Sequence, residues 1–139
     1  PEAVWEIESG GKLSVESAGK AMLDRSAMYQ AGVEMFKKYD YLVVPTAQCF
    51  PFDKSIHWPK EVAGRTMDTY HRWMEVVILA SLMGCPSISV LVGFNADGLP
   101  MGMQIIGRPQ GDFETLQIAY EYEKATEWTK KCPSPFATK

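Results

Sequence analysis

Two apolar segments separated by a short turn constrain the fold of this chain more than any other feature. Residues 87–94, SISVLVGF, and residues 101–107, MGMQIIG, flank the segment NADGLP. Asp97 followed by Gly98 is a strong turn signal, because glycine readily adopts the left-handed backbone that tight turns need. The pattern therefore predicts a β-hairpin made of these two strands.

Helices are expected on either side of this hairpin, at residues 14–38, 66–83 and about 113–130, capped by Ser14, Thr66 and Asp112. The first has apolar residues every three or four positions, as an amphipathic helix does. The second is apolar nearly all round and is expected to be deeply buried. Gly84 follows it and fits the left-handed position that ends many helices.

A short strand and a long loop complete the expected order. Residues 41–45, YLVVP, form a β-branched run that predicts a strand buried on both faces, and residues 46–65 form an irregular segment. The alternation predicts an α/β fold, with a mixed sheet sandwiched by helices. Three parts are expected: an irregular segment at 1–13, an α/β domain at 14–131 and a frayed tail at 132–139. The chain has no initiator methionine, so we expect a piece of a longer protein.

Composition narrows the functional classes. The chain has 139 residues, which is the size of one domain, and a net charge of −3. This balance gives no basic surface for nucleic acid, and no apolar run approaches the ~18 residues that a membrane span needs. Three cysteines without a C-x-x-C pair favour a reduced, cytoplasmic setting. Neither the cysteines nor the two histidines have the spacing of a metal site.

The segment GCPSISV, residues 84–90, holds the candidate nucleophiles. Cys85 follows a helix C-terminus, whose dipole disfavours the thiolate, so we interpret it as a buried filler. Ser87 and Ser89 share one strand face and lack the G-x-S-x-G elbow, which favours a close-packing role. His71 is predicted to neighbour Asp68 and Glu75 on a helix. These residues form no complete catalytic set.

The loop at 46–65 is rich in aromatic side chains: Phe50, Phe52 and Trp58, with His57 beside the tryptophan. In open α/β sheets, ligands bind beyond the carboxyl ends of strands, and this loop begins where the strand 41–45 ends. The aromatic side chains can line a pocket, and plain packing explains them equally well.

Several motifs together resemble the C-terminal part of the amidase-signature family. They are Tyr39-Asp40 and Pro45-Thr46 around the first strand, the strand from Gly84 to Gly93, the run DGLPMGMQIIG from Asp97 to Gly107, and Tyr120-Glu121 or Tyr122-Glu123 in the last helix. Gln48, Ser81 and Leu91 depart from the family pattern.

The resemblance implies hydrolysis of carboxylic amides through a serine acyl-enzyme without a cofactor. It also implies that the catalytic serines and lysine lie upstream, so this chain supplies no catalytic residue and no metal ligand. Its contribution would be the wall of the acyl-binding cleft, lined by Phe50, Phe52, His57, Trp58, Met74 and Val77.

The expected partners are a small amide and either the N-terminal half of the amidase or a second copy that covers the apolar run Val76–Met83. The alternative is a non-catalytic amidase-like module for binding or assembly. A third hypothesis, a self-contained cysteine or serine hydrolase that uses His71, has less support in the sequence.

Overall fold

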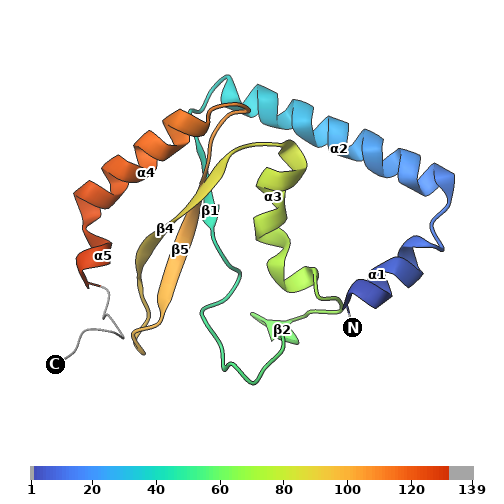
Figure 1. Cartoon of the computed structure of the whole chain (residues 1–139), viewed down its shortest axis with the longest axis horizontal. Helices are drawn as coiled ribbons and strands as arrows, with labels where there is room; N and C mark the ends of the chain where they lie inside the picture. The colour runs from blue at the N-terminus through green and yellow to red at the C-terminus, as the bar shows by residue number, and fades with distance from the viewer. Residues whose placement is uncertain (1, 132–139) are drawn as a thin grey trace.

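The computed structural model of the chain describes residues 2–131, and the tail predicted at 132–139 lies outside them. The elements run α1 (Glu2–Gly10), α2 (Val15–Phe36), β1 (Leu42–Pro45), β2 (Glu61–Val62), β3 (Arg65–Thr66), the 3₁₀ helix η1 (Arg72–Met74), α3 (Glu75–Met83), β4 (Ser87–Phe94), β5 (Pro100–Ile106), α4 (Asp112–Thr126) and α5 (Trp128–Lys131). In Figure 1, α4 and α5 lie on one side of the hairpin, and α3 lies on the other. The α/β class is thereby confirmed.

The predicted hairpin is present and forms the centre of the sheet. β4 and β5 pair antiparallel, and β1 pairs antiparallel with the other edge of β5, which gives the order β1-β5-β4. The Asn95 side chain holds the turn, because its Oδ1 accepts hydrogen bonds from Asp97 N at 2.9 Å and Leu99 N at 2.8 Å. All pairings among these three strands are antiparallel.

The two faces of the sheet receive different helices. Ile106, Leu42 and Val44 point to the face that α3 covers, where they pack with Ala80 and Met83. Ile88 and Val90 belong to the opposite face and line a hollow against α4. The sheet is therefore covered by helices on both sides.

Strand β1 forms where it was predicted, but it is not buried on both faces. It is an edge strand, and its burial alternates along the chain. Val43 is 52% exposed, while Leu42 and Val44 pack into the core cluster. The apolar run therefore reflects one covered face and one open face.

Helix α2 confirms the predicted helix at 14–38. Ser14 is its N-cap, and its Oγ accepts a hydrogen bond from Ser17 N at 3.0 Å. The C-terminal part of the helix packs on the rest of the protein, where Gly32 lies against Met83 of α3 and Met28 and Phe36 join the core cluster. Nearer the middle of the helix, Arg25 Nε donates a hydrogen bond to Leu82 O at 3.1 Å.

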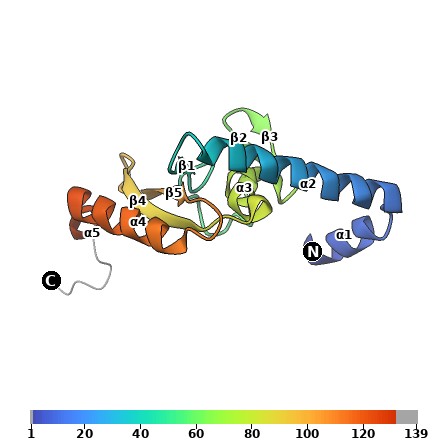
Figure 2. The same ribbon diagram turned by 90° about the horizontal axis from the view of Figure 1, so that it is seen from above.

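Residues 1–13 were expected to be irregular, and this expectation is wrong, because Glu2–Gly10 form helix α1. Figure 2 shows α2 extending well beyond the sheet, with α1 turning back beneath its far end. We call residues 2–27 the arm, and within the part of the chain that the structure describes, the arm contains no buried residue.

The helix predicted at 66–83 is shorter and more exposed than expected. Thr66 is not a cap but the end of strand β3, and the α-helix begins only at Glu75. Ala80 and Met83 are buried, whereas Ile78 and Leu82 are each 39% exposed. Gly84 ends the helix in the left-handed conformation, as predicted.

The last predicted helix divides in two. Gly111 rather than Asp112 occupies the N-cap position of α4, and Glu127 adopts a left-handed conformation between α4 and α5. No helix within residues 2–131 is long and apolar enough to cross a membrane.

Candidate functional site

A hollow of ≈ 300 Å³ lies beyond the carboxyl end of β1, where the sequence predicted a binding site. It is lined by Thr46, Ala47, Cys49, Phe50, Pro51, Phe52, Trp73, Pro100, Met101 and Gly102. Its volume is at the lower end of the range for small-molecule sites. We call it the Phe50 hollow. No acidic or basic side chain lines it, so it suits an uncharged, apolar group.

The floor of the Phe50 hollow is held by a pair of hydroxyls. Thr46 Oγ1 and Ser89 Oγ lie 2.7 Å apart, and the backbone N–H of Thr46 donates to the carbonyl of Gly102 at 2.9 Å. A Cβ on residue 102 would lie 2.8 Å from both hydroxyl oxygens, so a larger residue would displace them. This close approach explains one glycine of the DGLPMGMQIIG run.

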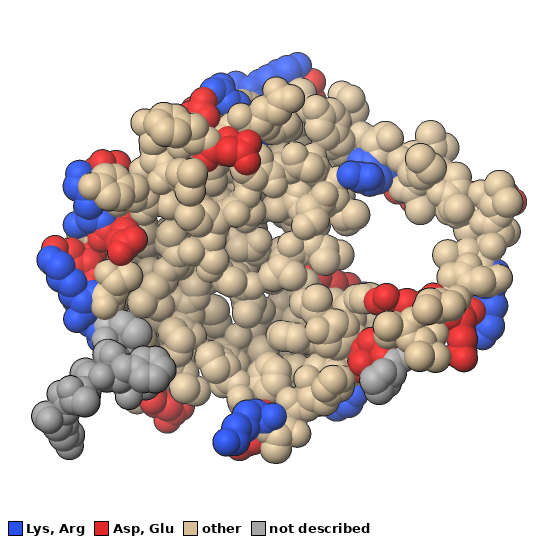
Figure 3. All heavy atoms as spheres, in the orientation of Figure 1, with Lys and Arg blue, Asp and Glu red and all other residues tan. Residues whose placement is uncertain are grey.

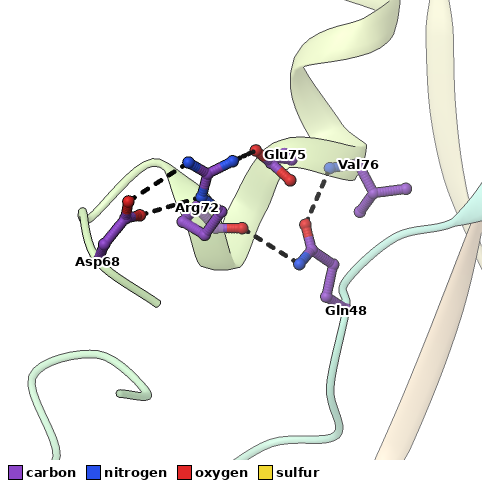
Figure 4. Close-up of polar contacts among 5 residues, drawn as sticks. All are labelled: Gln48, Asp68, Arg72, Glu75 and Val76. Atoms are coloured by element: carbon purple, nitrogen blue, oxygen red, sulfur yellow. Dashed lines mark hydrogen bonds and ion pairs between the residues drawn. The ribbon is translucent and has the colours of Figure 1, made fainter. Parts of the chain in front are cut away.

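The side chain of Gln48 attaches its own loop, which also carries Phe50, to the start of α3. Its Nε2 donates to Arg72 O at 3.2 Å, and its Oε1 accepts from Val76 N at 3.1 Å (Figure 4). The amides of a first helical turn lack partners within the helix, and Met74 supplies no side-chain cap. Gln48 satisfies one of these amides from a distant segment.

Gln104 joins three segments beneath the same floor. Its Nε2 donates to Pro45 O at 3.1 Å and to Val76 O at 3.3 Å, and its Oε1 accepts from Ser87 Oγ at 3.4 Å. The residue is only 6% exposed, so its amide depends on these partners. The network connects β1, β4, β5 and α3.

Arg72 forms ion pairs with two carboxylates on the surface next to Gln48. Its Nε lies 3.0 Å from Asp68 Oδ1, and its Nη1 lies 2.7 Å from Glu75 Oε1 (Figure 4). The hydrogen bond from Arg72 lowers the pKa of Asp68. Arg72 thus takes the two carboxylates that were predicted to neighbour His71.

Both histidines pair instead with the arm. His57 Nε2 lies 2.9 Å from Glu2 Oε1, and His71 Nε2 lies 2.6 Å from Glu6 Oε1. Ser87 and Ser89 have Gln104 and Thr46 as partners. The contacts found within residues 2–131 therefore include no serine–histidine pair.

Cys49 and Cys85, the two cysteines within residues 2–131, also lack the environment of a nucleophile. Burial raises the pKa of the Cys49 thiol and of the Cys85 thiol, which keeps both protonated at neutral pH. Cys85 Sγ lies 3.8 Å from Met83 O and packs against the core, as the filler interpretation predicted. Among the described residues, no cluster of three or more histidines, cysteines and carboxylates can hold a metal ion.

The residues predicted to line the cleft lie in separate parts of the structure. Phe50 and Phe52 line the Phe50 hollow. Trp58 lines a second hollow beside α1, and His57 stacks against Tyr70 there. Met74 and Val77 lie at the start of α3 and line neither of these two hollows.

Sequence reasoning missed several residues of the Phe50 hollow, chiefly Trp73, Cys49 and Met101. Trp73 comes from η1 and meets Phe52 edge to face, with ring centroids 5.7 Å apart. Only the tertiary fold brings these segments together. Gln48 and Gln104 were the available sequence signal for this site, because a polar amide inside an apolar stretch needs hydrogen-bond partners once it is buried.

The fold and this hollow define an α/β protein with an apolar site and no nucleophile–base pair among the contacts of its described residues. A family model described as Amidase matches residues 2–116, so the chain belongs to the amidase family. The predicted resemblance to amidase-signature enzymes is confirmed.

Curated relatives of the chain include enzymes with different names. It is 34% identical over 116 residues to a glutamyl-tRNA(Gln) amidotransferase subunit of Dehalococcoides mccartyi, covering 82% of this chain and 22% of that protein. It is 38% identical over 102 residues to a fatty acid amide hydrolase of Medicago truncatula, covering 73% of this chain and 16% of that protein. The chain thus spans about a fifth of the length of these curated relatives.

A solved structure supports the same family. A bacterial aryl acylamidase of the amidase-signature family superposes with a TM-score of 0.83 at 29% identity, covering 94% of this chain and 27% of that one. The relatives and this neighbour are named for different reactions or substrates.

Proposed function

We propose that this chain is the C-terminal part of an amidase that hydrolyses carboxylic amides through a serine acyl-enzyme. The family match over residues 2–116 carries the proposal. The catalytic serines and lysine would lie upstream in the parent protein, because no residue of this chain corresponds to them.

The role proposed for the chain is to form one wall of the acyl-binding cleft. The Phe50 hollow is apolar, uncharged and placed at the end of β1. Gln48, Thr46 and Ser89 hold its floor in a fixed position. A preorganised apolar wall orients the acyl group of an amide without taking part in the bond-breaking step.

A large uncovered apolar surface supports the view that further protein covers this chain. The accessible surface is 10243 Å², whereas a folded monomer of this mass has roughly 7,300 Å². The apolar side chains that are more than half exposed include Val4, Ile7, Leu13, Val15, Met22, Leu23, Phe113, Leu116 and Tyr120. Figure 3 shows an opening between the arm and the rest of the molecule, which further protein can fill.

The cytoplasm is the proposed location. Cys49 and Cys85 are both free thiols, which is the state that a reducing compartment maintains.

Activity measurements on this chain, alone and joined to the upstream part of its gene product, test the proposal. The chain alone is expected to hydrolyse no amide, and the joined protein is expected to be active. Hydrolysis by the isolated chain that persists in the triple variant Cys85→Ala, Ser87→Ala, Ser89→Ala would contradict the proposal. An inactive joined protein would favour the non-catalytic module.

In an active parent protein, Phe50→Ala is expected to raise KM for amides with bulky acyl groups about tenfold or more, with a smaller change for acetamide. Ile56→Ala is the matched control, because Ile56 lies in the same loop, is 46% exposed and lies outside the hollow. Equal effects of the two substitutions would remove the Phe50 hollow from the cleft.

A further inference from the structure

A second hollow, of ≈ 410 Å³, lies between α1 and the segment that leads into η1. Its lining residues are Glu2, Trp5, Trp58, Asp68, Thr69 and Tyr70. Three aromatic rings and two carboxylates thus share one small space. We call it the Trp58 hollow, and the function proposed above assigns it no role in bond cleavage.

Two of the rings of the Trp58 hollow stand nearly at right angles. Trp58 and Tyr70 meet edge to face, with centroids 6.4 Å apart and planes inclined at 86°. Tyr70 is also stacked on His57, with centroids 6.5 Å apart. Rings at right angles present a face and an edge to the same guest, and aromatic faces attract cations through their quadrupole.

One cation already lies on this aromatic surface. The ammonium of Lys60 is 3.0 Å from the centroid of the Trp58 ring. Lys60 does not line the hollow itself, so the hollow remains beside it. This contact shows that the Trp58 ring attracts a positive charge, and that Lys60 competes with a guest cation for the ring.

The charge around the Trp58 hollow has the matching sign. The hydrogen bond from Arg72 lowers the pKa of Asp68, and a backbone hydrogen bond makes the largest contribution to lowering the pKa of Glu2. Both carboxylates are therefore ionised at neutral pH, although Arg72 neutralises part of the charge of Asp68 and His57 Nε2 lies within hydrogen-bond distance of Glu2. Figure 3 shows acidic side chains gathered around the α1 end of the molecule.

From these contacts we propose that the Trp58 hollow binds a small organic ammonium ion, such as a quaternary or methylated amine. The aromatic walls suit the methyl groups of the cation, and the two carboxylates supply the opposing charge. A metal ion fits poorly, since only two carboxylates line the hollow, and no cluster of three or more histidines, cysteines and carboxylates that could hold a metal exists among the described residues. A neutral guest of the same shape gains nothing from the charge or the quadrupole.

The proposal is independent of amide hydrolysis, although the two hollows are physically connected. Tyr70 contacts Trp73 edge to face at 6.3 Å, and Trp73 contacts Phe52 in the same way at 5.7 Å. A continuous row of aromatic rings therefore runs from the Trp58 hollow to the Phe50 hollow.

Titration of the chain with choline, followed by calorimetry and tryptophan fluorescence, tests the proposal. The reference ligand is 3,3-dimethylbutan-1-ol, which has the shape of choline without its charge. Choline is expected to bind saturably and at least tenfold more tightly than the alcohol. Equal binding of the two, or no binding of choline, would overturn the proposal.

Two variants locate the site. Trp58→Leu is expected to weaken choline binding at least tenfold, whereas Lys60→Met should strengthen it, because it removes a competing charge and opens the ring face. Lys60 is exposed, so this variant remains informative even if Trp58→Leu unfolds. An unchanged affinity in Lys60→Met, or in a folded Trp58→Leu, would contradict the proposal.

Trp128→Phe is the matched control. Lys131 lies 4.5 Å from the Trp128 ring, but Trp128 does not line the Trp58 hollow. Its substitution should leave choline binding unchanged, and a loss equal to that in Trp58→Leu would refute the assignment. A peptide with trimethyllysine carries the same ammonium, so its affinity relative to choline identifies whether the natural source is a free amine or a modified protein.

Discussion

The sheet with its covering helices and the arm (residues 2–27) are made of similar residues but differ in what covers them. In the sheet region, Ile106 is 0% exposed and Gln104 has a partner for each polar atom of its side chain. In the arm, Met22 and Leu23 are 73% and 72% exposed. An apolar helix face is stabilised by what it buries, so the face of the sheet beneath α3 is covered within this chain, and the arm awaits a covering surface.

The comparison also shows how the arm is held in place. The arm reaches the rest of the protein through the pairs His57–Glu2 and His71–Glu6 at one end, through the hydrogen bond from Arg25 Nε to Leu82 O, and through the remainder of α2 at the other end. Exposed ion pairs of this kind contribute little to stability. The arm should therefore respond weakly to substitutions that would strongly destabilise the sheet region.

The largest effect is expected for Ile106→Ala in the chain as it stands. Ile106 is fully buried among residues of α3 and β1, so its truncation should lower the free energy of unfolding by about 2–5 kcal/mol. Denaturant titration measures this change. Val43→Ala is the control on the open face of β1, and a comparable loss there would erase the distinction between covered and open surfaces.

Glycine substitutions in the two regions should differ in sign. A Cβ on residue 107 would lie 2.1 Å from Thr115 Oγ1, so Gly107→Ala should cost about 1–3 kcal/mol through overpacking. Nothing lies within 4 Å of the corresponding position at Gly19, so Gly19→Ala should raise helicity and stability by up to about 1 kcal/mol. Thermal unfolding of both variants checks the pair.

A double-mutant cycle sharpens this prediction. Thr115→Ala removes the clashing oxygen, so it should cost less in the Gly107→Ala background than in the original chain. Additive effects would mean that the backbone moves to relieve the contact.

Smaller still is the effect expected for Met22→Ser and Leu23→Ser. Both side chains are exposed in the chain alone, so each substitution should change its stability by no more than about 0.5 kcal/mol. The same substitutions should cost more in the parent protein, where we propose that this face is covered. Equal small effects in both settings would argue that the arm stays uncovered.

The smallest effect concerns pH. Arg72 lowers the pKa of Asp68 in the folded chain. This pair therefore stabilises the fold at pH values above 3.8, the ordinary pKa of an aspartate side chain. That contribution is lost as the pH falls through the lowered folded pKa. Thermal unfolding of Asp68→Asn should therefore approach that of the original chain at low pH, and a difference that grows on acidification would contradict the sign.

The hairpin and the first long helix were predictable because their signals are local. The Asp97-Gly98 turn and the Ser14 cap act on residues nearby in the chain, and both are present in the structure. The α/β class followed from the order of these elements, and the family resemblance rested on the same hairpin.

The failures have non-local causes. Thr66 was predicted to begin a helix, but it pairs with Glu61 in a two-stranded sheet, and Gln48 caps the helix from a distant loop at Val76. Helix α1 was missed, and its pairs with the two histidines span more than 50 residues of sequence.

The candidate site was predictable only in part for the same reason. Phe50 and Phe52 were predicted as site residues because they follow a strand end, and both line the Phe50 hollow. Trp73 joins them only through the tertiary packing of η1. His57 and Trp58 were grouped with them because they are close in sequence. The fold places these two against Tyr70 and the arm instead.

Hydrogen exchange on the isolated chain tests the contrast between the two regions most directly. The amides of β5 should exchange only through global unfolding, whereas those of residues 15–27 in α2 should exchange at least a hundredfold faster through local opening. Equal protection of the two segments would contradict the account, because it would mean that the arm is stable without any covering surface.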